Sequence, residues 1–363
     1  KTFLKHTAKD YHNQSVNPPV VRASTIIFKS MQDIRKMQDK AKKDPTGGHF
    51  DYGRQGTSTT HVLSQILKKI EECHHVFLTP TGFGAVFLAV FSVTRPGDEI
   101  IVADPTYNPT RILTQDFLKE FNIKTIFYDP HDLKTIEKRI NKKTKLIFVE
   151  NPGSNSFDFQ DLGKILSIAK KNKILTAIDN TWGTPYFLKP IKLGFDMSIV
   201  SATKYYSGHS DVMGGSLAVN KKVFNAVDKT HKITGLRLGP DDAYLITRGL
   251  RTLDVRLDKH EKNSRIVADF LAKYKNIKLL YPHKKDSFNF RMWKKYYSGA
   301  SGLMGLKIKS KNKNSVIKFV NSLRLFGYGY SWGGFESLAL YQDKREQGNR
   351  EYLKLAKDEH LVR

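Results

Sequence analysis

Residues 174–204 read ILTAIDNTWGTPYFLKPIKLGFDMSIVSATK, and two short apolar runs, 174–179 and 197–202, stand out in them. Similar runs occur earlier in the chain, at HVFLT (75–79), EIIVA (99–103), IKTIFY (123–128) and KLIFVE (145–150). Helical patterns precede or separate most of these runs, at 58–71, 82–94, 107–119, 133–140 and 160–171. Strands that alternate with helices predict βαβ units and a mostly parallel sheet with helices on both faces.

The pattern changes at Pro240. The stretch 240–274 predicts one or two long helices, because Pro240 and the acidic pair Asp241–Asp242 suit a helix start. Residues 276–363 mix strand-like SGLMGLKIK with helix-like NSVIKFVNSL, which predicts a smaller α+β domain. Residues 1–55 look irregular. We therefore expect an N-terminal arm over 1–55, a main α/β domain over 56–239 and a C-terminal domain over 240–363.

The composition narrows the functional classes. Hydrophobic residues make up 39% of the 363 residues and aromatic residues 11%, which favours a globular protein. The longest apolar run, VFLAVFSV (86–93), is too short to cross a bilayer, and the polar N-terminus does not resemble a signal peptide. The single cysteine, Cys73, excludes an internal disulfide and a multi-cysteine metal site. We expect a cytoplasmic protein with no metal and no membrane partner.

The net charge of +26, with a pI near 9.8, is the usual first sign of nucleic-acid binding. The basic residues, however, are scattered in short clusters such as KKDP, KKIE, KKNK and KKTK. No basic stripe interleaved with aromatic residues and no nucleic-acid motif is present in the sequence. We therefore expect no nucleic-acid partner, and a basic nucleic-acid-binding protein remains the alternative from a different class.

Three predicted strand ends carry groups that can bind a ligand or react. TPTGFGA (79–85) places Gly82 and Phe83 where a strand turns into a helix, which is an anion site by backbone geometry or an ordinary glycine turn. Asp179 ends a second apolar run, as a counter-ion or as a helix cap. Lys204 follows a third run, as a nucleophilic amine in partly desolvated surroundings or as a solvated surface charge.

The combination is more specific than its parts. A phosphate turn, a carboxylate for a ring nitrogen and a lysine beside the hydroxyls of Ser201 and Thr203 are what pyridoxal phosphate requires of a protein. Tyr107, in DPTYNPT after another predicted strand, can supply an aromatic face for the ring. The sequence therefore predicts a pyridoxal-phosphate site at the carboxyl ends of the strands.

The chain resembles the cystathionine enzymes of the Cys/Met-metabolism group of fold-type I pyridoxal-phosphate proteins. The resemblance begins at NPPVVRASTIIF (17–28) and continues to the last residue. The motifs that carry it are YGRQGTSTT (52–60), ENPGS (150–154), IDNTWGTP (178–185), SATKYYSGHSD (201–211), RGLRTLDVRLDKH (248–260) and YSWGGFES (330–337). It implies an aspartate-aminotransferase-like large domain and a smaller C-terminal α+β domain.

The resemblance also implies roles for named residues. Lys204 would carry the cofactor as a Schiff base and later act as general base. Asp179 would pair with the pyridine nitrogen, and Tyr107 would stack on the ring and take part in catalysis. The phosphate would be bound by the residues of the glycine turn and the hydroxyls before the lysine, namely Gly82, Phe83, Ser201 and Thr203. Tyr52 and Arg54 would reach the phosphate of a neighbouring subunit in a homotetramer built from pairs of dimers.

The expected substrate is a small amino acid. Tyr330, Ser331, Trp332 and Arg363 are the expected substrate-binding residues, with Arg363 as a bidentate anchor for the α-carboxylate. The family continues with a strand and a helix beyond that arginine, so the C-terminal domain looks truncated. Trp332 after Ser331, and Trp182 in DNTW, resemble the β-lyases more than the γ-lyases and γ-synthases, which remain alternatives. No firm role follows for His209 and Asp211, for which a structural turn is favoured over catalysis.

Overall fold

The computed structural model describes residues 2–5, 15–283, 285, 287–343, 350–352 and 355–363. Its larger sheet has seven strands in the order β1 (His75–Thr79), β7 (Gly215–Val219), β6 (Met197–Ser201), β5 (Leu175–Asp179), β4 (Thr144–Glu150), β2 (Glu99–Ala103) and β3 (Lys124–Tyr128). The pairs from β6 to β3 are parallel, while β7 is antiparallel to both β6 and β1. All strands except β7 therefore run in one direction, and their carboxyl ends meet at one edge.

Alternating side chains bury both faces of this sheet. Along β2, Ile101 and Ala103 belong to one apolar cluster, whereas Ile100 and Val102 belong to another. This period of two is what a pleated strand covered on both faces requires. The first cluster includes residues of α3 (Ser58–Glu71) and α8 (Leu162–Lys171), and the second includes residues of α4 (Gly82–Val93) and α11 (Phe224–Thr234). The predicted helix-covered, mostly parallel sheet is confirmed.

The remaining elements of this region are short. They are α5 (Asn108–Ile112), the π-helical turn η2 (Leu113–Phe117), α6 (Leu118–Glu120), α7 (Lys134–Glu137), α9 (Thr184–Phe187) and α10 (Pro190–Leu193). The helix predicted over 107–119 is thus three consecutive pieces. Strand β7 was not predicted from the sequence, because GSLAV is short and itself begins with a glycine that follows Gly214.

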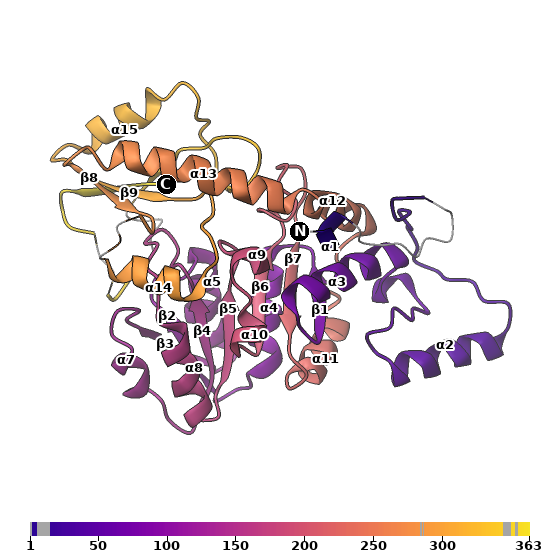
Figure 1. Ribbon diagram of the computed structural model, residues 1–363. Coiled ribbons are helices and arrows are strands. Elements are labelled where there is room, and N and C mark those ends of the chain that lie inside the picture. Colours follow the sequence, from indigo (N-terminus) through magenta and orange to yellow (C-terminus); the bar gives the residue numbers. More distant parts are fainter. Residues whose placement is uncertain (1, 6–14, 284, 286, 344–349, 353–354) are drawn as a thin grey trace.

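The C-terminal region builds a second, antiparallel sheet in the order β10 (Tyr341–Gln342), β11 (Glu359–Val362), β9 (Gly305–Lys309) and β8 (Ile277–Leu280). The long helices α12 (Pro240–Leu250) and α13 (Leu253–Leu271) lead into it, and α14 (Phe288–Tyr296) and α15 (Lys313–Asn321) complete it. Figure 1 shows α13 and α15 with this smaller sheet above the larger sheet.

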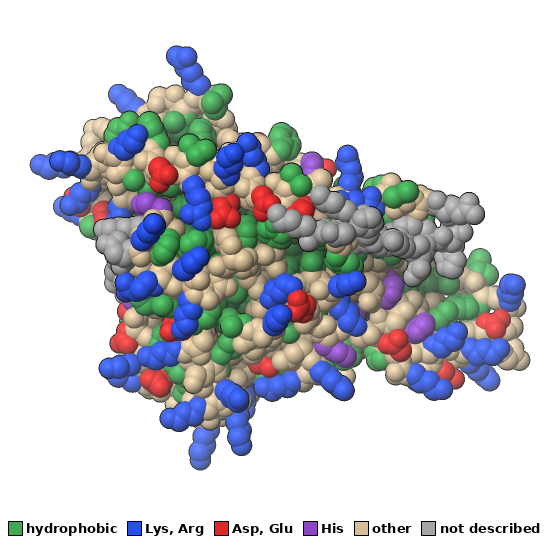
Figure 2. All heavy atoms as spheres, in the orientation of Figure 1, with side chains coloured by type: hydrophobic (Ala, Val, Ile, Leu, Met, Phe, Trp, Pro, Cys, Tyr) green, Lys and Arg blue, Asp and Glu red, His purple; other side chains and the backbone are tan. Residues whose placement is uncertain are grey.

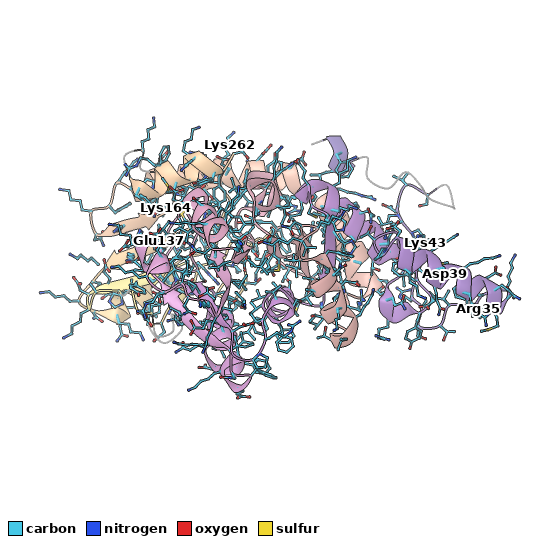
Figure 3. The ribbon with its side chains drawn as sticks, turned by 90° about the horizontal axis from the view of Figure 1, so that it is seen from below. Arg35, Asp39, Lys43, Glu137, Lys164 and Lys262 are labelled. Carbon is cyan, nitrogen blue, oxygen red and sulfur yellow. The ribbon has the colours of Figure 1, made fainter. Side chains whose placement is uncertain are left out.

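The N-terminal region differs from the expectation that residues 1–55 are irregular. It contains α1 (Thr2–Lys5), the 13-residue helix α2 (Met31–Lys43) and a 3₁₀ turn, η1 (Gly53–Gln55). The side chain of Ser30 caps α2 by accepting a hydrogen bond from the amide of Asp33, and the Gln-, Lys- and Met-rich sequence favours a helix. Helix α2 buries no residue and stands away from both sheets (Figure 1), with Arg35, Asp39 and Lys43 along it (Figure 3).

Positive charge is spread over the surface. In Figure 2 the Lys and Arg side chains are dispersed over the visible face, interrupted by hydrophobic and acidic groups, with no single basic stripe. Among the described residues, no helix combines the length and the hydropathy needed to cross a membrane, and no cluster of His, Cys, Asp and Glu has the geometry of a metal site.

Candidate active site

A pocket of about 260 Å³ opens where the carboxyl ends of the large sheet face the C-terminal region. Eleven of the residues predicted from the sequence line it, although they come from distant parts of the chain: Gly82, Phe83, Tyr107, Asp179, Ser201, Thr203, Lys204, Tyr330, Ser331, Trp332 and Arg363. Parallel sheets bind ligands at this edge, because the strand ends bring their loops together there. Tyr52 and Arg54 do not line the pocket.

Lys204 lies in the loop that follows β6. Its Nζ donates a hydrogen bond to Ser331 Oγ at 2.5 Å and lies 5.5 Å from the centre of the Trp332 ring. Burial, assisted by the positive charge of Arg363, lowers the pKa of Lys204 to about 8, although the carboxylate of Asp179 opposes this shift. The amine is therefore easier to deprotonate than a solvated lysine, which suits a nucleophile or base.

The loop that carries Lys204 is held in place by a partly buried arginine. Arg256, in α13, donates from Nη1 to the carbonyl of Tyr205 and from Nη2 to the carbonyl of Gly249, both at 2.7 Å. A Cβ at Gly208, whose φ is +69°, would lie 2.2 Å from Arg256 Nη1, so the guanidinium fits only against glycine. Part of the RGLRTLDVRLDKH motif therefore positions the lysine without lining the pocket.

Two carboxyl groups lie side by side at the ends of neighbouring strands. Glu150 of β4 is paired in register with Asp179 of β5. Glu150 Oε2 accepts hydrogen bonds from the amide of Tyr107 at 2.6 Å and from Thr106 Oγ1 at 3.1 Å, whereas Asp179 Oδ1 accepts from the amide of Thr181 at 2.9 Å. Burial and the negative charge of Asp179 raise the pKa of Glu150 well above its usual value. We infer that Glu150 holds a proton and Asp179 carries the charge.

Tyr107 lies at the mouth of the pocket. Its side chain is 47% exposed, and it precedes α5, with Pro109 in the first turn of that helix. Burial raises the pKa of the Tyr107 hydroxyl, so this hydroxyl keeps its proton near neutral pH. The bond from its own amide to Glu150 fixes the position of the residue. Sequence reasoning missed Glu150, because a glutamate in ENPGS has no distinctive spacing of its own.

The N-terminus of α4 forms an anion cradle. Thr81 caps this helix by accepting from the amide of Gly84 at 2.9 Å, which leaves the amides of Gly82 and Phe83 at the pocket. A Cβ at Gly82 would lie 2.5 Å from Ser201 Oγ, so only glycine permits this approach. The Thr203 hydroxyl instead bonds to both the amide and the carbonyl of Gly214, at 3.0 and 3.2 Å. That hydroxyl already has two partners in the loop.

The opposite wall is the segment 330–334. Ser331 has a φ of +80°, which is unusual for a residue other than glycine and indicates local strain. Arg363 Nη2 donates to the Ser331 carbonyl at 3.4 Å, and the backbone of Arg363 pairs with that of Leu340. A Cβ at Gly333 would lie 3.2 Å from the Lys204 backbone, so this segment packs directly on the lysine loop.

A hydrogen bond joins these two loops outside the pocket. Ser210 Oγ donates to the carboxylate of Glu336, with its two oxygens at 2.6 and 2.7 Å. Ser210 lies between His209 and Asp211, which are exposed and do not line the pocket. The Nδ1 of His209 lies 2.6 Å from the Ser207 carbonyl. Ser210 and Glu336 belong to two motifs and are 126 residues apart in the chain. The residue spacing within either motif gives no sign of their contact.

Trp182 forms part of the pocket wall. Its indole N–H donates to the Leu303 carbonyl at 2.9 Å, and its ring makes edge-to-face contacts with Phe159 and Tyr297. The side chain is only 5% exposed. It therefore connects the large domain to the C-terminal region by packing as well as bordering the pocket.

The pocket fits a pyridine ring that bears an aldehyde and a phosphate. Three features meet in the pocket: the lysine with a lowered pKa, the carboxylate of Asp179, and an anion cradle in which position 82 has no room for a Cβ. Fold and site together define a pyridoxal-phosphate-dependent enzyme. The model of the Cys/Met metabolism PLP-dependent enzyme family matches residues 2–363, and the chain belongs to this family. It is a carbon–sulfur lyase of that group that uses pyridoxal phosphate.

Known relatives share most of their length with this chain. A putative cystathionine β-lyase from Rhizobium johnstonii is 35% identical over 94% of this chain and 85% of its own. An L-alanine/L-glutamate racemase from Wolbachia pipientis is 32% identical over 91% and 83%. The structure of a putative O-acetylhomoserine (thiol)-lyase from Campylobacter jejuni, which contains N′-pyridoxyl-lysine-5′-monophosphate, superposes with a TM-score of 0.87 at 26% identity, covering 99% and 94% of the two chains.

Proposed function

We propose that the chain is a cystathionine β-lyase, also called a cysteine-S-conjugate β-lyase. The reaction consumes water and converts L-cystathionine to homocysteine, pyruvate and ammonia. The observation that carries the proposal is the contact of Lys204 Nζ with Ser331 Oγ at 2.5 Å, beside Trp332. This contact joins the proposed base to the Ser-Trp pair that resembles the β-lyases.

The residues of this pocket would divide the binding of the cofactor. Lys204 would form the covalent link, Asp179 would bind the ring nitrogen, and Tyr107 would cover one face of the ring. The amides of Gly82 and Phe83 would bind the phosphate.

Two hydroxyls near the lysine would contribute unequally. Ser201 Oγ would lie 2.5 Å from a Cβ at position 82, so it is close enough to the cradle to add a hydroxyl to the phosphate site. Thr203 contributes less directly, because Gly214 occupies its hydroxyl. When bound, pyridoxal phosphate accepts the electron pair left when a proton leaves the substrate Cα.

The protein groups divide the remaining work. Arg363 would bind the substrate α-carboxylate through its guanidinium, close to the Ser331 carbonyl. The neutral amine of Lys204, favoured by its lowered pKa, would take the Cα proton. Tyr107, whose raised pKa keeps its hydroxyl protonated, or Lys204 would then give a proton to the departing sulfur. Asp179 would keep a proton on the ring nitrogen.

We also propose that the active site is completed by a second copy, within a homotetramer of dimer pairs. Tyr52 is 45% exposed, and neither Tyr52 nor Arg54 reaches the pocket of its own chain. Arg54 Nη1 instead donates to the Lys232 carbonyl at 3.2 Å. Their exposure on the N-terminal segment supports a role in a neighbouring subunit. A cytoplasmic location likewise remains a proposal.

Product analysis with L-cystathionine separates the candidate reactions. Pyruvate with homocysteine supports the β-lyase, whereas 2-oxobutyrate with cysteine indicates a γ-lyase, and synthesis of cystathionine from an activated homoserine and cysteine indicates a γ-synthase. Because one relative is named a racemase, L-alanine and L-glutamate should be tested for D-products in the same preparation. Salt-dependent DNA binding without a cofactor absorption band would favour the nucleic-acid-binding alternative.

A further inference from the structure

A second cavity lies apart from the active site. Its volume is about 150 Å³, and none of the proposed catalytic, cofactor-binding or substrate-binding residues lines it. One wall is the N-terminal segment around residues 45–57, and the other is formed by β1, α11 and the turn at 237–240. The cavity therefore separates the N-terminal segment from the body of the large domain.

Arg237 contributes an unusual charge to this wall. It is partly buried, and within the described part of the chain its guanidinium makes no hydrogen bond or ion pair; its Nε is buried without an acceptor. The carboxylate that acts on it through space, Asp228, is instead paired with Lys232 at 2.6 Å. A partly buried guanidinium without an acceptor is costly, so a cavity beside it favours an oxygen-bearing ligand.

His231 lines the same cavity, and one of its ring nitrogens has no hydrogen-bond partner among the described residues. It is 2% exposed, and its Nε2 lies 2.9 Å from the Leu78 carbonyl, which can only accept, so Nε2 carries the hydrogen. Burial, followed by the charge of Arg237, lowers the pKa of His231 to about 3, and the ring is neutral at physiological pH. Its buried Nδ1 is then a bare acceptor, for which the described residues provide no donor.

His75 extends the same pattern. Its Nδ1 is also buried without a partner among the described residues, and burial lowers the pKa of its ring to about 3. The positive charge of Arg237 helps to lower the pKa of both imidazoles, so the three side chains act on one another electrostatically. The cavity therefore offers a cationic donor, one fixed neutral acceptor and one imidazole nitrogen that can be either.

We propose that this cavity binds a protonated oxyanion, of which hydrogen phosphate is the simplest example. Its charged oxygens would accept from Arg237, and its P–OH group would donate to Nδ1 of His231. Sulfate and simple carboxylates carry negative oxygens but no proton to donate near neutral pH. The ligand would bridge the N-terminal segment and the body of the domain, since Gly53 and Gln55 line the opposite wall.

The test is calorimetric titration of the cofactor-loaded enzyme with inorganic phosphate and, in parallel, with sulfate. We expect one phosphate per chain at this site. Sulfate should bind at least about tenfold more weakly, because it has no proton to donate and loses the hydrogen bond to Nδ1 of His231. Arg237→Gln should weaken phosphate binding at least about tenfold, with Arg237→Lys in between. The matched control is Arg363→Lys, which alters the arginine proposed to bind the substrate carboxylate in the active-site pocket.

Three results would overturn the proposal. They are an absence of phosphate binding, equal binding of phosphate and sulfate, and phosphate binding that is lost in Arg363→Lys but kept in Arg237→Gln. The comparison of phosphate with sulfate uses only the unaltered enzyme, so it remains decisive if Arg237→Gln does not fold. Phosphate, but not sulfate, should also slow proteolysis within residues 45–57, which gives a readout independent of catalysis.

Discussion

The amine of Lys204 and the hydroxyl of Ser331 are 2.5 Å apart, although 127 residues separate them in the chain. Lys204 follows a strand of the large sheet, and Ser331 belongs to the C-terminal region. The contact therefore closes the pocket between the two regions. It places the proposed base beside the segment proposed to bind the substrate, so each region supplies one part of the site.

The charge of Arg363 should influence both substrate binding and the base. Removal of this charge in Arg363→Gln removes one cause of the lowered pKa of Lys204, so that pKa should rise from about 8. Because the neutral amine is the active form, activity should increase as the pH rises through this pKa. The rising limb of the pH–rate profile should therefore move to higher pH in the variant. KM should also rise by about 100-fold or more, since the proposed charged hydrogen bonds from Arg363 to the substrate carboxylate are lost. A pH–rate profile that does not move would contradict this relation.

The protonation of Glu150 can be tested with an isostere. If Glu150 is protonated, Glu150→Gln keeps an oxygen that accepts from Tyr107 and Thr106, and activity should stay within about threefold of the parent enzyme. Glu150→Ala removes the acceptor for both the Tyr107 amide and the buried Thr106 hydroxyl, and kcat should fall by about tenfold or more. Steady-state rates of the two variants check this. An equal loss in both would show that the negative charge of Glu150 is required.

The bond between Ser210 and Glu336 should affect substrate binding more than cofactor binding. Ser210→Ala loosens the contact between the lysine loop and segment 330–334, so KM should rise by about fivefold, as expected for one hydrogen bond at an accessible site. The cofactor absorption spectrum should not change. Glu336→Ala should give a similar effect, and the double variant should be no worse than either. Additive effects in that cycle would show that the two residues act separately.

Sharing of the active site predicts complementation between two inactive variants. Arg54→Ala and Lys204→Ala damage different sites if Arg54 serves the neighbouring subunit. Random mixing of equal amounts should then restore about a quarter of the parent activity, because about half of the dimers are mixed and each contains one intact site. The measurement is activity after co-refolding of the two variants. No recovery, in a preparation that demonstrably contains mixed dimers, would place Arg54 in its own subunit's site.

Most of the fold was predictable because hydrophobic period and strand-end chemistry are local properties. The strand runs at 75–79 and 99–103 match β1 and β2, and the groups at the strand ends meet because parallel strands end at one edge. Helix α2 was missed because it depends on a cap at Ser30 and on intrinsic propensity, with no buried face to reveal it. Its isolation from both sheets explains why the hydrophobic pattern gives no signal there.

The site was only partly predictable for a related reason. Lys204 and Asp179 can be recognised because they follow apolar strands, whereas Glu150 and the bond from Ser210 to Glu336 acquire meaning only through neighbours far away in sequence. Arg237 and His231 are ordinary residues until folding buries them beside one cavity. Buried hydrogen-bonding deficits depend on three-dimensional packing, which residue type and spacing do not encode.

Borohydride reduction followed by peptide mapping can show whether Lys204 is the covalent anchor of pyridoxal phosphate. We expect a single phosphopyridoxyl group on the peptide that contains Lys204. Neither Lys204→Ala nor Lys204→Gln should form a reducible adduct after incubation with the cofactor. Rates for these variants should fall by about a thousandfold or more, since both nucleophile and general base are lost. A reduced adduct on another lysine, or one that survives in Lys204→Ala with activity retained, would contradict the assignment.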